Sequence, residues 1–148
     1  MSKIYFAGPL FTWGEREQNR QVAAGLRARG HEVFVPQETE QQNATARGIF
    51  KGDIAGIDWS ELVVACMDGA DPDSGTCFEA GYVYQVKPII LYRTDIREEK
   101  APLGPYNLML HAAANEVLNL QWQEPDIIAG SIDGAIIRTI GYGAPPTS

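Results

Sequence analysis

The sequence predicts an α/β fold: a single-domain, doubly wound parallel sheet flanked by helices, as in Rossmann-like and flavodoxin-like domains. Short apolar runs typical of strands alternate with longer segments of helical periodicity along the chain. The run LVVACM at 62–67 is apolar throughout, as in strands that are buried on both faces of a parallel sheet. Because the chain has 148 residues and no internal repeat, we expect one domain over residues 1–142 and a flexible tail over residues 143–148.

The first half of the chain is expected to fold as strand, helix, strand and helix. The run KIYFAGPLF has the pattern of a buried strand until a Gly-Pro pair breaks it. Apolar residues at helical spacing follow, Gly30 ends this helix as a C-cap glycine does, and HEVFVP forms a second short strand. Isoleucines at helical spacing then predict a helix over residues 44–59.

The second half repeats this alternation. After the buried run at 62–67, the pattern predicts a helix over residues 76–86, a strand at PIILYR, a helix over residues 106–117 and a final amphipathic helix over residues 127–140. Ligands of such sheets bind in the crevice at the carboxyl ends of the strands. The loops expected to build the site are therefore GPLFTWGE, PQETEQQN and DGADPDSGT.

Charge and cysteine content narrow the class of ligand. A net charge of -7 and a pI near 4.7 argue against nucleic acid or an anionic membrane as a partner and favour small or neutral ligands. Cys66 and Cys77 have neither metal-type spacing nor a nearby histidine, so we expect no disulfide framework, no metal ion and the reducing cytoplasm. The first residues are strand-like rather than signal-like, and no apolar run approaches the ~18 residues of a membrane span.

The segment DPDSGTCFEAGY raises the question of whether Glu79 caps a helix or performs chemistry. Thr76 and Glu79 have the spacing of a capping box, in which the glutamate binds the amide of the N-cap residue. If Ser74 is the cap instead, Glu79 lies in the second helical turn, near the strand ends and free to react. The helix N-terminus would then favour its charged form, which suits a nucleophile.

Other carboxylates have similar alternatives. Asp71 and Asp73 are residue types typical of turns. Asp53 is either a solvent-exposed charge on a helix or a side chain that lies near Glu79 at the same edge of the sheet. Glycosyl transfer uses a cluster of carboxylates of this kind. One carboxylate attacks the anomeric carbon of the sugar, while another acid assists departure of the leaving group. The common nucleotide-binding and hydrolase motifs are absent, and neither histidine has an obvious Ser or Cys partner.

Four segments in order, KIYFAGPLF, RGIFKGDIAGID, DSGTCFEAGY and PYNLML, together resemble the nucleoside 2-deoxyribosyltransferase family over most of the chain. The resemblance implies transfer of a 2-deoxyribosyl group between nucleobases by a retaining double displacement, through a covalent glutamyl-deoxyribose intermediate. It implies nucleosides and free nucleobases as partners, and neither a cofactor nor a metal ion.

The most specific part of the resemblance is the pattern G-x-x-x-E-x-G-Y over residues 75–82, with Asp73 six residues before the glutamate. By this resemblance Glu79 is the nucleophile, Tyr5 orients it, and Asp73 holds sugar hydroxyls. Asp53 handles the proton on the base.

The resemblance also implies substrate contacts. Gly8, Phe11 and Gln37 are expected to contact the substrate, the last two at the base, although the loop PQETEQQN aligns ambiguously and leaves residues 40–41 as alternatives to Gln37. Asn107 and Met109 match a segment that family members lend to a neighbouring subunit. We therefore expect a homo-oligomer, a dimer or higher, with shared active sites.

Two other functions compete with transfer. A related N-glycosidase would hydrolyse 2'-deoxynucleoside 5'-monophosphates with the same nucleophile, but the loop after the first strand has no basic residue before Arg16 to neutralise a phosphate. A nucleotide-binding module without catalysis would have no use for a desolvated glutamate in a crevice. The sequence leaves the choice between purine and pyrimidine bases open.

Overall fold

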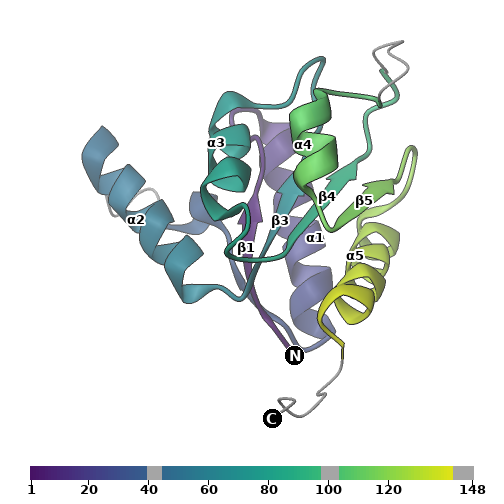
Figure 1. Ribbon diagram of the computed structural model, residues 1–148, viewed down its shortest axis with the longest axis horizontal. Coiled ribbons are helices and arrows are strands. Elements are labelled where there is room, and N and C mark those ends of the chain that lie inside the picture. Colours follow the sequence, from purple (N-terminus) through teal and green to yellow (C-terminus); the bar gives the residue numbers. More distant parts are fainter. Residues whose placement is uncertain (40–44, 98–103, 142–148) are drawn as a thin grey trace.

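The sheet of the protein is fully parallel. The computed structural model describes residues 1–39, 45–97 and 104–141, and its strands lie in the order β2-β1-β3-β4-β5 (Figure 1). The strands are β1 (Lys3–Ala7), β2 (Glu32–Phe34), β3 (Leu62–Cys66), β4 (Ile89–Arg93) and β5 (Glu116–Asn119). Every neighbouring pair is parallel, and this order is that of flavodoxin-like domains. The predicted fold class is confirmed.

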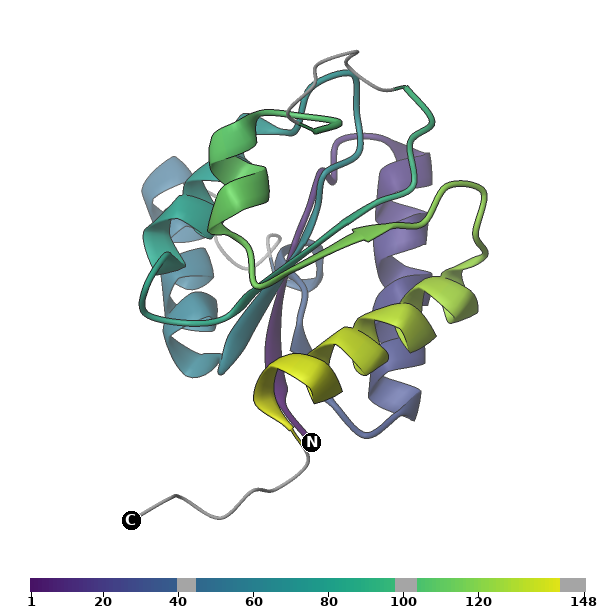
Figure 2. The same cartoon turned by 45° about the vertical axis from the view of Figure 1, so that its right-hand side comes forward.

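Helices cover both faces of the sheet (Figure 2). On one face lie α1 (Trp13–Ala28) and α5 (Pro125–Ile140). On the other face lie α2 (Ala46–Trp59), α3 (Ser74–Val83) and α4 (Leu108–Ala113). The 3-10 turn η1 (Pro36–Glu38) follows β2. Among the described residues, no helix combines the length and the apolar character that crossing a membrane requires.

Each face of the sheet has its own apolar core, because alternate residues of a strand point to opposite faces. Ile4 and Phe6 pack in the core that contains α1 and α5. Tyr5 and Ala7 pack in the core that contains residues of α2, α3 and the loop before α4. Tyr5 is fully buried, and its ring stacks on Phe34 with the ring centroids 5.5 Å apart. The face of β1 that carries Tyr5 is thus the one that α2 and α3 cover.

We expect Gly25→Ala to destabilise the protein by about 1–2 kcal/mol, because α1 and α5 leave no room for another methyl group. A Cβ atom at Gly25 would lie 2.6 Å from the Cβ atom of Ala129. The gain in helix propensity, at most ~1 kcal/mol, is too small to offset this clash. Gly14→Ala in the same helix is the matched control, because a Cβ atom there meets nothing within 4 Å. Urea unfolding checks both; wild-type stability of Gly25→Ala would contradict the close approach.

The predicted boundaries of helices and strands differ most from the structure in the segment that forms α4 and β5. The single helix predicted over residues 106–117 is wrong, since the chain forms the short helix α4 and then the edge strand β5. Val117 is paired with Leu91 of β4, and this tertiary pairing decides the conformation of a four-residue segment. The helix predicted over residues 76–86 begins and ends earlier, at Ser74 and Val83. The tail predicted over residues 143–148 lies outside the described residues.

The C-terminal end of α2 is tied to the segment that precedes β4. The Lys87 Nζ atom donates to the carbonyl oxygens of Ile57, Asp58 and Ser60 at 2.5, 3.1 and 2.7 Å. A cation at this end of a helix also meets the negative end of the helix dipole. Lys87 thereby fixes the position of α2, the helix that carries Asp53.

Candidate active site

The start of α3 decides the role of Glu79. Asp73 is the N-cap residue, and its Oδ2 atom accepts hydrogen bonds from the backbone amide and the hydroxyl of Thr76, at 2.9 and 3.0 Å. Thr76 is therefore inside the helix, and a capping box formed by Thr76 and Glu79 is wrong. Glu79 lies in the second turn, as the alternative with Ser74 as cap requires, although the cap is one residue earlier. Its side chain is not used to cap the helix.

The ionisation of Glu79 is set by its surroundings. Burial raises the pKa of this carboxyl to about 7, and the negative charges of Asp53 and Asp73 act in the same direction. A hydrogen bond from Tyr5 opposes the rise. The sequence predicts that the helix N-terminus favours the charged form of Glu79, and burial acts on this pKa in the opposite direction. Glu79 titrates close to neutral pH, where a catalytic carboxyl group changes its charge most readily.

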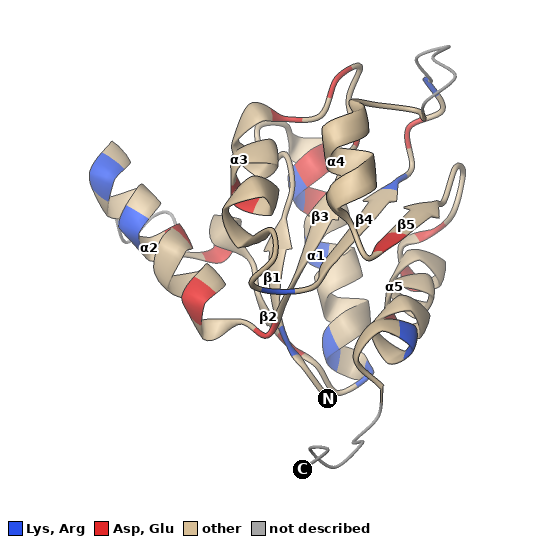
Figure 3. Cartoon of the chain, viewed as in Figure 1, with Lys and Arg blue, Asp and Glu red and all other residues tan. Residues whose placement is uncertain are grey.

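A cavity between α2 and α3 brings the two main candidates together. Its volume is about 360 Å³, which is within the range of small-molecule sites. The cavity is lined by Phe50, Asp53, Ile54, Ile57, Gly75, Phe78 and Glu79. Figure 3 shows acidic residues on both helices and in the loop between β3 and α3. Asp53 shares this cavity with Glu79, and Tyr5 and Asp73 lie close enough to Glu79 to affect its pKa.

If Glu79 must be ionised to react, kcat/KM falls as the pH drops below the pKa of Glu79. We expect Tyr5→Phe to shift this acidic fall of kcat/KM to higher pH. The hydrogen bond from Tyr5 lowers the pKa of Glu79, so its loss raises that pKa further above the ordinary value. Less of the ionised form is then present at pH 6–7, and activity there should fall severalfold. The pH dependence of kcat/KM measures the shift. Tyr106→Phe removes another buried hydroxyl from the same apolar core and should leave the limb in place.

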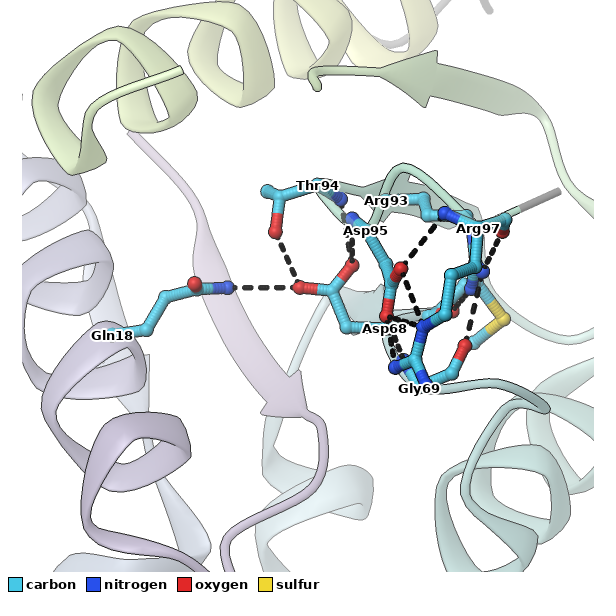
Figure 4. Close-up of polar contacts among 8 residues, drawn as sticks. Gln18, Asp68, Gly69, Arg93, Thr94, Asp95 and Arg97 are labelled. Carbon is cyan, nitrogen blue, oxygen red and sulfur yellow. Dashed lines mark hydrogen bonds and ion pairs between the residues drawn. The ribbon is translucent and has the colours of Figure 1, made fainter. Parts of the chain in front are cut away.

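A polar network holds the loop between β3 and α3 (Figure 4). The Asp68 carboxylate accepts hydrogen bonds from the amide and hydroxyl of Thr94 at 2.6 and 2.5 Å, from the Asp95 amide at 3.0 Å, and from Gln18 Nε2 at 3.2 Å. These contacts fix the first residue after Met67 to the end of β4. The loop that leads to Asp73 thus begins from a rigid point.

The next residues of this loop are held in the same way. Gly69 donates its amide to Asp95 at 3.2 Å and accepts a hydrogen bond from Arg93 at 3.0 Å. Arg93 is almost fully buried and also donates to the carbonyl oxygens of Met67 and Arg97. Arg97 pairs with Asp95, and this ion pair lowers the pKa of the Asp95 carboxyl. These contacts join the start of the loop between β3 and α3 to the end of β4.

Three predicted substrate contacts lie outside this cavity. Gly8 follows β1, where a Cβ atom would come within 3.1 Å of the Cys66 Cβ atom. Phe11 precedes α1 and is 74% exposed. Gln37 accepts a hydrogen bond from Asn19 at 3.1 Å and donates to the Arg16 carbonyl at 2.8 Å, so its amide joins η1 to α1. The alternatives at residues 40–41 lie outside the described residues.

Asn107 and Met109 also lie apart from the cavity within one chain. Asn107 caps α4 by accepting the Met109 amide at 2.9 Å. Met109 lines a second cavity, of about 360 Å³, on the other flank of α3, together with Cys77. The two cavities are separated by α3 itself, since Cys77 and Glu79 project from different sides of it.

The two cysteines differ in their access to solvent. Cys66 is buried in β3, and this burial strongly raises the pKa of its thiol. Cys77 is partly exposed, and burial raises the pKa of its thiol as well. Over the described ranges, no three His, Cys, Asp or Glu side chains are grouped so that they could hold a metal ion.

Two aromatic residues of the cavity were not among the sequence predictions. Phe50 precedes Asp53 by one helical turn, and Phe78 directly precedes Glu79. Their ring centroids are 6.2 Å apart. The signal available in the sequence was this pairing of an aromatic residue with each candidate carboxylate. It could not be used without knowing that α2 and α3 are neighbours.

Comparisons with known proteins identify the family of the chain. A family model described as nucleoside 2-deoxyribosyltransferase matches residues 4–121. An uncharacterized protein of Ureaplasma parvum serovar 3 is 32% identical over 137 residues, which cover 79% of this chain and 78% of the relative. A solved 2-deoxyribosyltransferase of Bacillus psychrosaccharolyticus is 25% identical, with a TM-score of 0.66 over 85% of this chain and 89% of that chain.

A CMP N-glycosidase of Clostridium botulinum shares the fold. It is 22% identical, with a TM-score of 0.56 over 88% of this chain and 97% of that chain. The match of the family model covers the strands, the loops at their carboxyl ends and the helices that carry Asp53 and Glu79. The chain therefore belongs to the nucleoside 2-deoxyribosyltransferase family.

Proposed function

We propose that the protein transfers the 2-deoxyribosyl group between nucleobases by a retaining double displacement, with Glu79 as the nucleophile. The observation that supports this most is the shared cavity, in which Glu79 and Asp53 lie on facing helices. The pKa of Glu79 near 7 allows the same group to be ionised for attack and to act as a leaving carboxylate. No cofactor is part of the proposal.

In the first half of the reaction, an oxygen of ionised Glu79 attacks the anomeric carbon of a 2'-deoxynucleoside. A new carbon–oxygen bond forms, the carbon–nitrogen bond to the base breaks, and its electron pair leaves with the base. Asp53 supplies a proton or a hydrogen bond to the departing base, and Asp73 binds the sugar hydroxyls. Positive charge that develops on the sugar is stabilised by the adjacent carboxylates in a partly dry site.

In the second half, a nitrogen of another base attacks the same carbon. The ester bond breaks, its electron pair returns to the Glu79 carboxylate, and the incoming base passes its N–H proton to Asp53. Two inversions at one carbon leave the configuration of the nucleoside unchanged. Nucleosides and free bases are thus both substrate and product.

Hydrolysis of a 2'-deoxynucleoside 5'-monophosphate is the alternative, because water could accept the sugar from Glu79. A phosphate dianion requires cationic partners. None of the described residues that line the cavity is a lysine or arginine. The charge of the site therefore favours a nucleoside over a nucleotide.

A second copy of the chain belongs to the proposal. Asn107 and Met109 are exposed and lie on the far flank of α3 from Glu79 in one chain. They would contribute to substrate binding from a neighbouring subunit of a homo-oligomer. Light scattering on the purified protein measures the size of that assembly.

Incubation with thymidine and adenine tests the proposed reaction. The expected products are deoxyadenosine and thymine, in equal amounts. Thymidine without an acceptor base and thymidine 5'-monophosphate are the parallel reactions, because they report hydrolysis of each substrate. Release of thymine only from the monophosphate, without transfer, would replace the proposal by the hydrolase.

A further inference from the structure

Three aromatic side chains form a continuous strip at the cavity that contains Glu79. Phe50 of α2 and Phe78 of α3 have ring centroids 6.2 Å apart, and Tyr82 of α3 stacks on Phe78, again at 6.2 Å. We call these residues the aromatic strip. The ring planes of Phe78 and Tyr82 differ by only 22°, whereas those of Phe50 and Phe78 are tilted by 53°.

The aromatic strip is exposed although it is apolar. Phe50 is 51% exposed, Phe78 is 55% exposed and Tyr82 is 46% exposed. Single exposed aromatic residues are common, but a contiguous group at a cavity marks a binding surface. The aromatic strip is therefore a candidate binding surface rather than a part of the apolar core.

The position of the strip relative to the carboxylates limits what it could bind. Phe50 lies one turn before Asp53, and Phe78 is adjacent to Glu79, so both rings border the cavity that these carboxylates line. A sugar carbon at Glu79 leaves the attached base within reach of Asp53. A flat ring in that place would border Phe50, Phe78 and Asp53, which line the same cavity. Because the two phenylalanine ring planes are tilted by 53°, the flat ring would stack on one of them and meet the other at an angle.

We infer that the aromatic strip is the stacking surface for the nucleobase and that it selects purines over pyrimidines. This inference deepens the proposed function and rests on it for the identity of the ligand. Base–aromatic stacking contributes to binding for every base, because each base has a π face. A bicyclic purine covers more of two neighbouring rings than a single pyrimidine ring does, and buried apolar area sets the gain.

Phe11 is the competing candidate for this role. Its ring is exposed at the start of α1, but it does not line the cavity of Asp53 and Glu79. A base held by Phe11 alone would not depend on Phe50 or Phe78. The two candidates therefore predict opposite results for substitutions in the strip.

Calorimetric titration with free adenine and free thymine tests the inference. Phe50→Leu, Phe78→Leu and the double variant keep apolar volume and helix propensity but remove the flat ring. We expect the wild type to bind adenine more tightly than thymine. The double variant should weaken adenine binding roughly tenfold and thymine binding much less. Phe78→Tyr keeps the ring and should retain adenine affinity, which separates stacking from loss of folding.

Trp59→Leu is the matched control, because Trp59 is an exposed aromatic residue of the same helix α2 that lines a different cavity. Unchanged adenine affinity in the double variant would overturn the inference, as would the absence of any base binding by the wild type. A change of oligomeric state with unchanged base affinity would also overturn it and make the strip a contact between subunits.

The failure of this inference is distinguishable from failure of the proposed function. If the wild type exchanges bases but the strip variants bind adenine normally, the function stands and the inference is wrong. If the wild type binds adenine through the strip but neither transfers nor hydrolyses, the inference stands and the proposed function is wrong.

Discussion

Glu79→Gln should lower the rate of transfer by roughly four orders of magnitude, equivalent to about 5 kcal/mol in the barrier. A neutral amide is a poor nucleophile and does not stabilise positive charge on the sugar. The side chain keeps its size, and it is not the helix cap, so the cavity should keep its shape. Steady-state exchange between thymidine and adenine measures the loss. Asp71→Asn, an exposed carboxylate of the preceding loop, is the control and should stay active.

A trapping experiment locates the nucleophile independently. A 2-fluoro-2-deoxy-arabinosyl nucleoside slows departure of the sugar, because fluorine disfavours the oxocarbenium-like state. Peptide mass spectrometry of the wild type should then find the sugar on Glu79, and Glu79→Gln should remain unlabelled. Label on Asp53 or Asp73, or near-full activity of Glu79→Gln, would refute the proposed mechanism.

The same substitution should make the protein more stable at alkaline pH. The Glu79 carboxyl has an ordinary pKa of 4.5 and a pKa of about 7 in the folded protein, so the folded state binds its proton more tightly. The stabilisation by this proton is complete below pH 4.5 and is lost as the pH rises through 7. The loss amounts to about 3 kcal/mol at most, from the size of the shift. Glutamine has no proton to lose.

Urea unfolding at pH 5 and pH 8 measures this effect. The free energy of unfolding of the wild type should fall relative to that of Glu79→Gln between these two values. Glu32→Gln, an exposed glutamate on the edge strand β2, provides the comparison and should follow the wild type. Parallel curves for wild type and Glu79→Gln would mean that the carboxyl is not desolvated in the folded state.

Much of the fold is predictable because its central strands are apolar on both faces. Residues Leu62 to Cys66 and Ile89 to Arg93 are fully buried in the structure, as their runs predict. The strand Glu116–Asn119 is different, since it is short, lies at the edge and is only partly buried. Its backbone pairing with β4, rather than its own residues, determines its conformation.

The site is predictable in its residues but less so in its physical state. The resemblance predicts that Glu79, Asp53, Asp73 and Tyr5 act together. In the structure these four residues lie near one another, while their roles stay predictions. The sequence offers Thr76 or Ser74 as the N-cap residue of α3, whereas Asp73 caps it in the structure. The raised pKa of Glu79 depends on how closely α2 packs against α3, which no local pattern reveals.

The two cysteines differ in solvent exposure, and this difference gives the protein a natural position for a chemical label. Of the two thiols in the chain, Cys66 is enclosed in the sheet, whereas Cys77 is partly open on the flank of α3 opposite to Glu79. A fluorinated or spin-labelled reagent would therefore attach at Cys77. Spectroscopy on that probe would report changes on the flank of α3 opposite to Glu79 while sugar is loaded and unloaded.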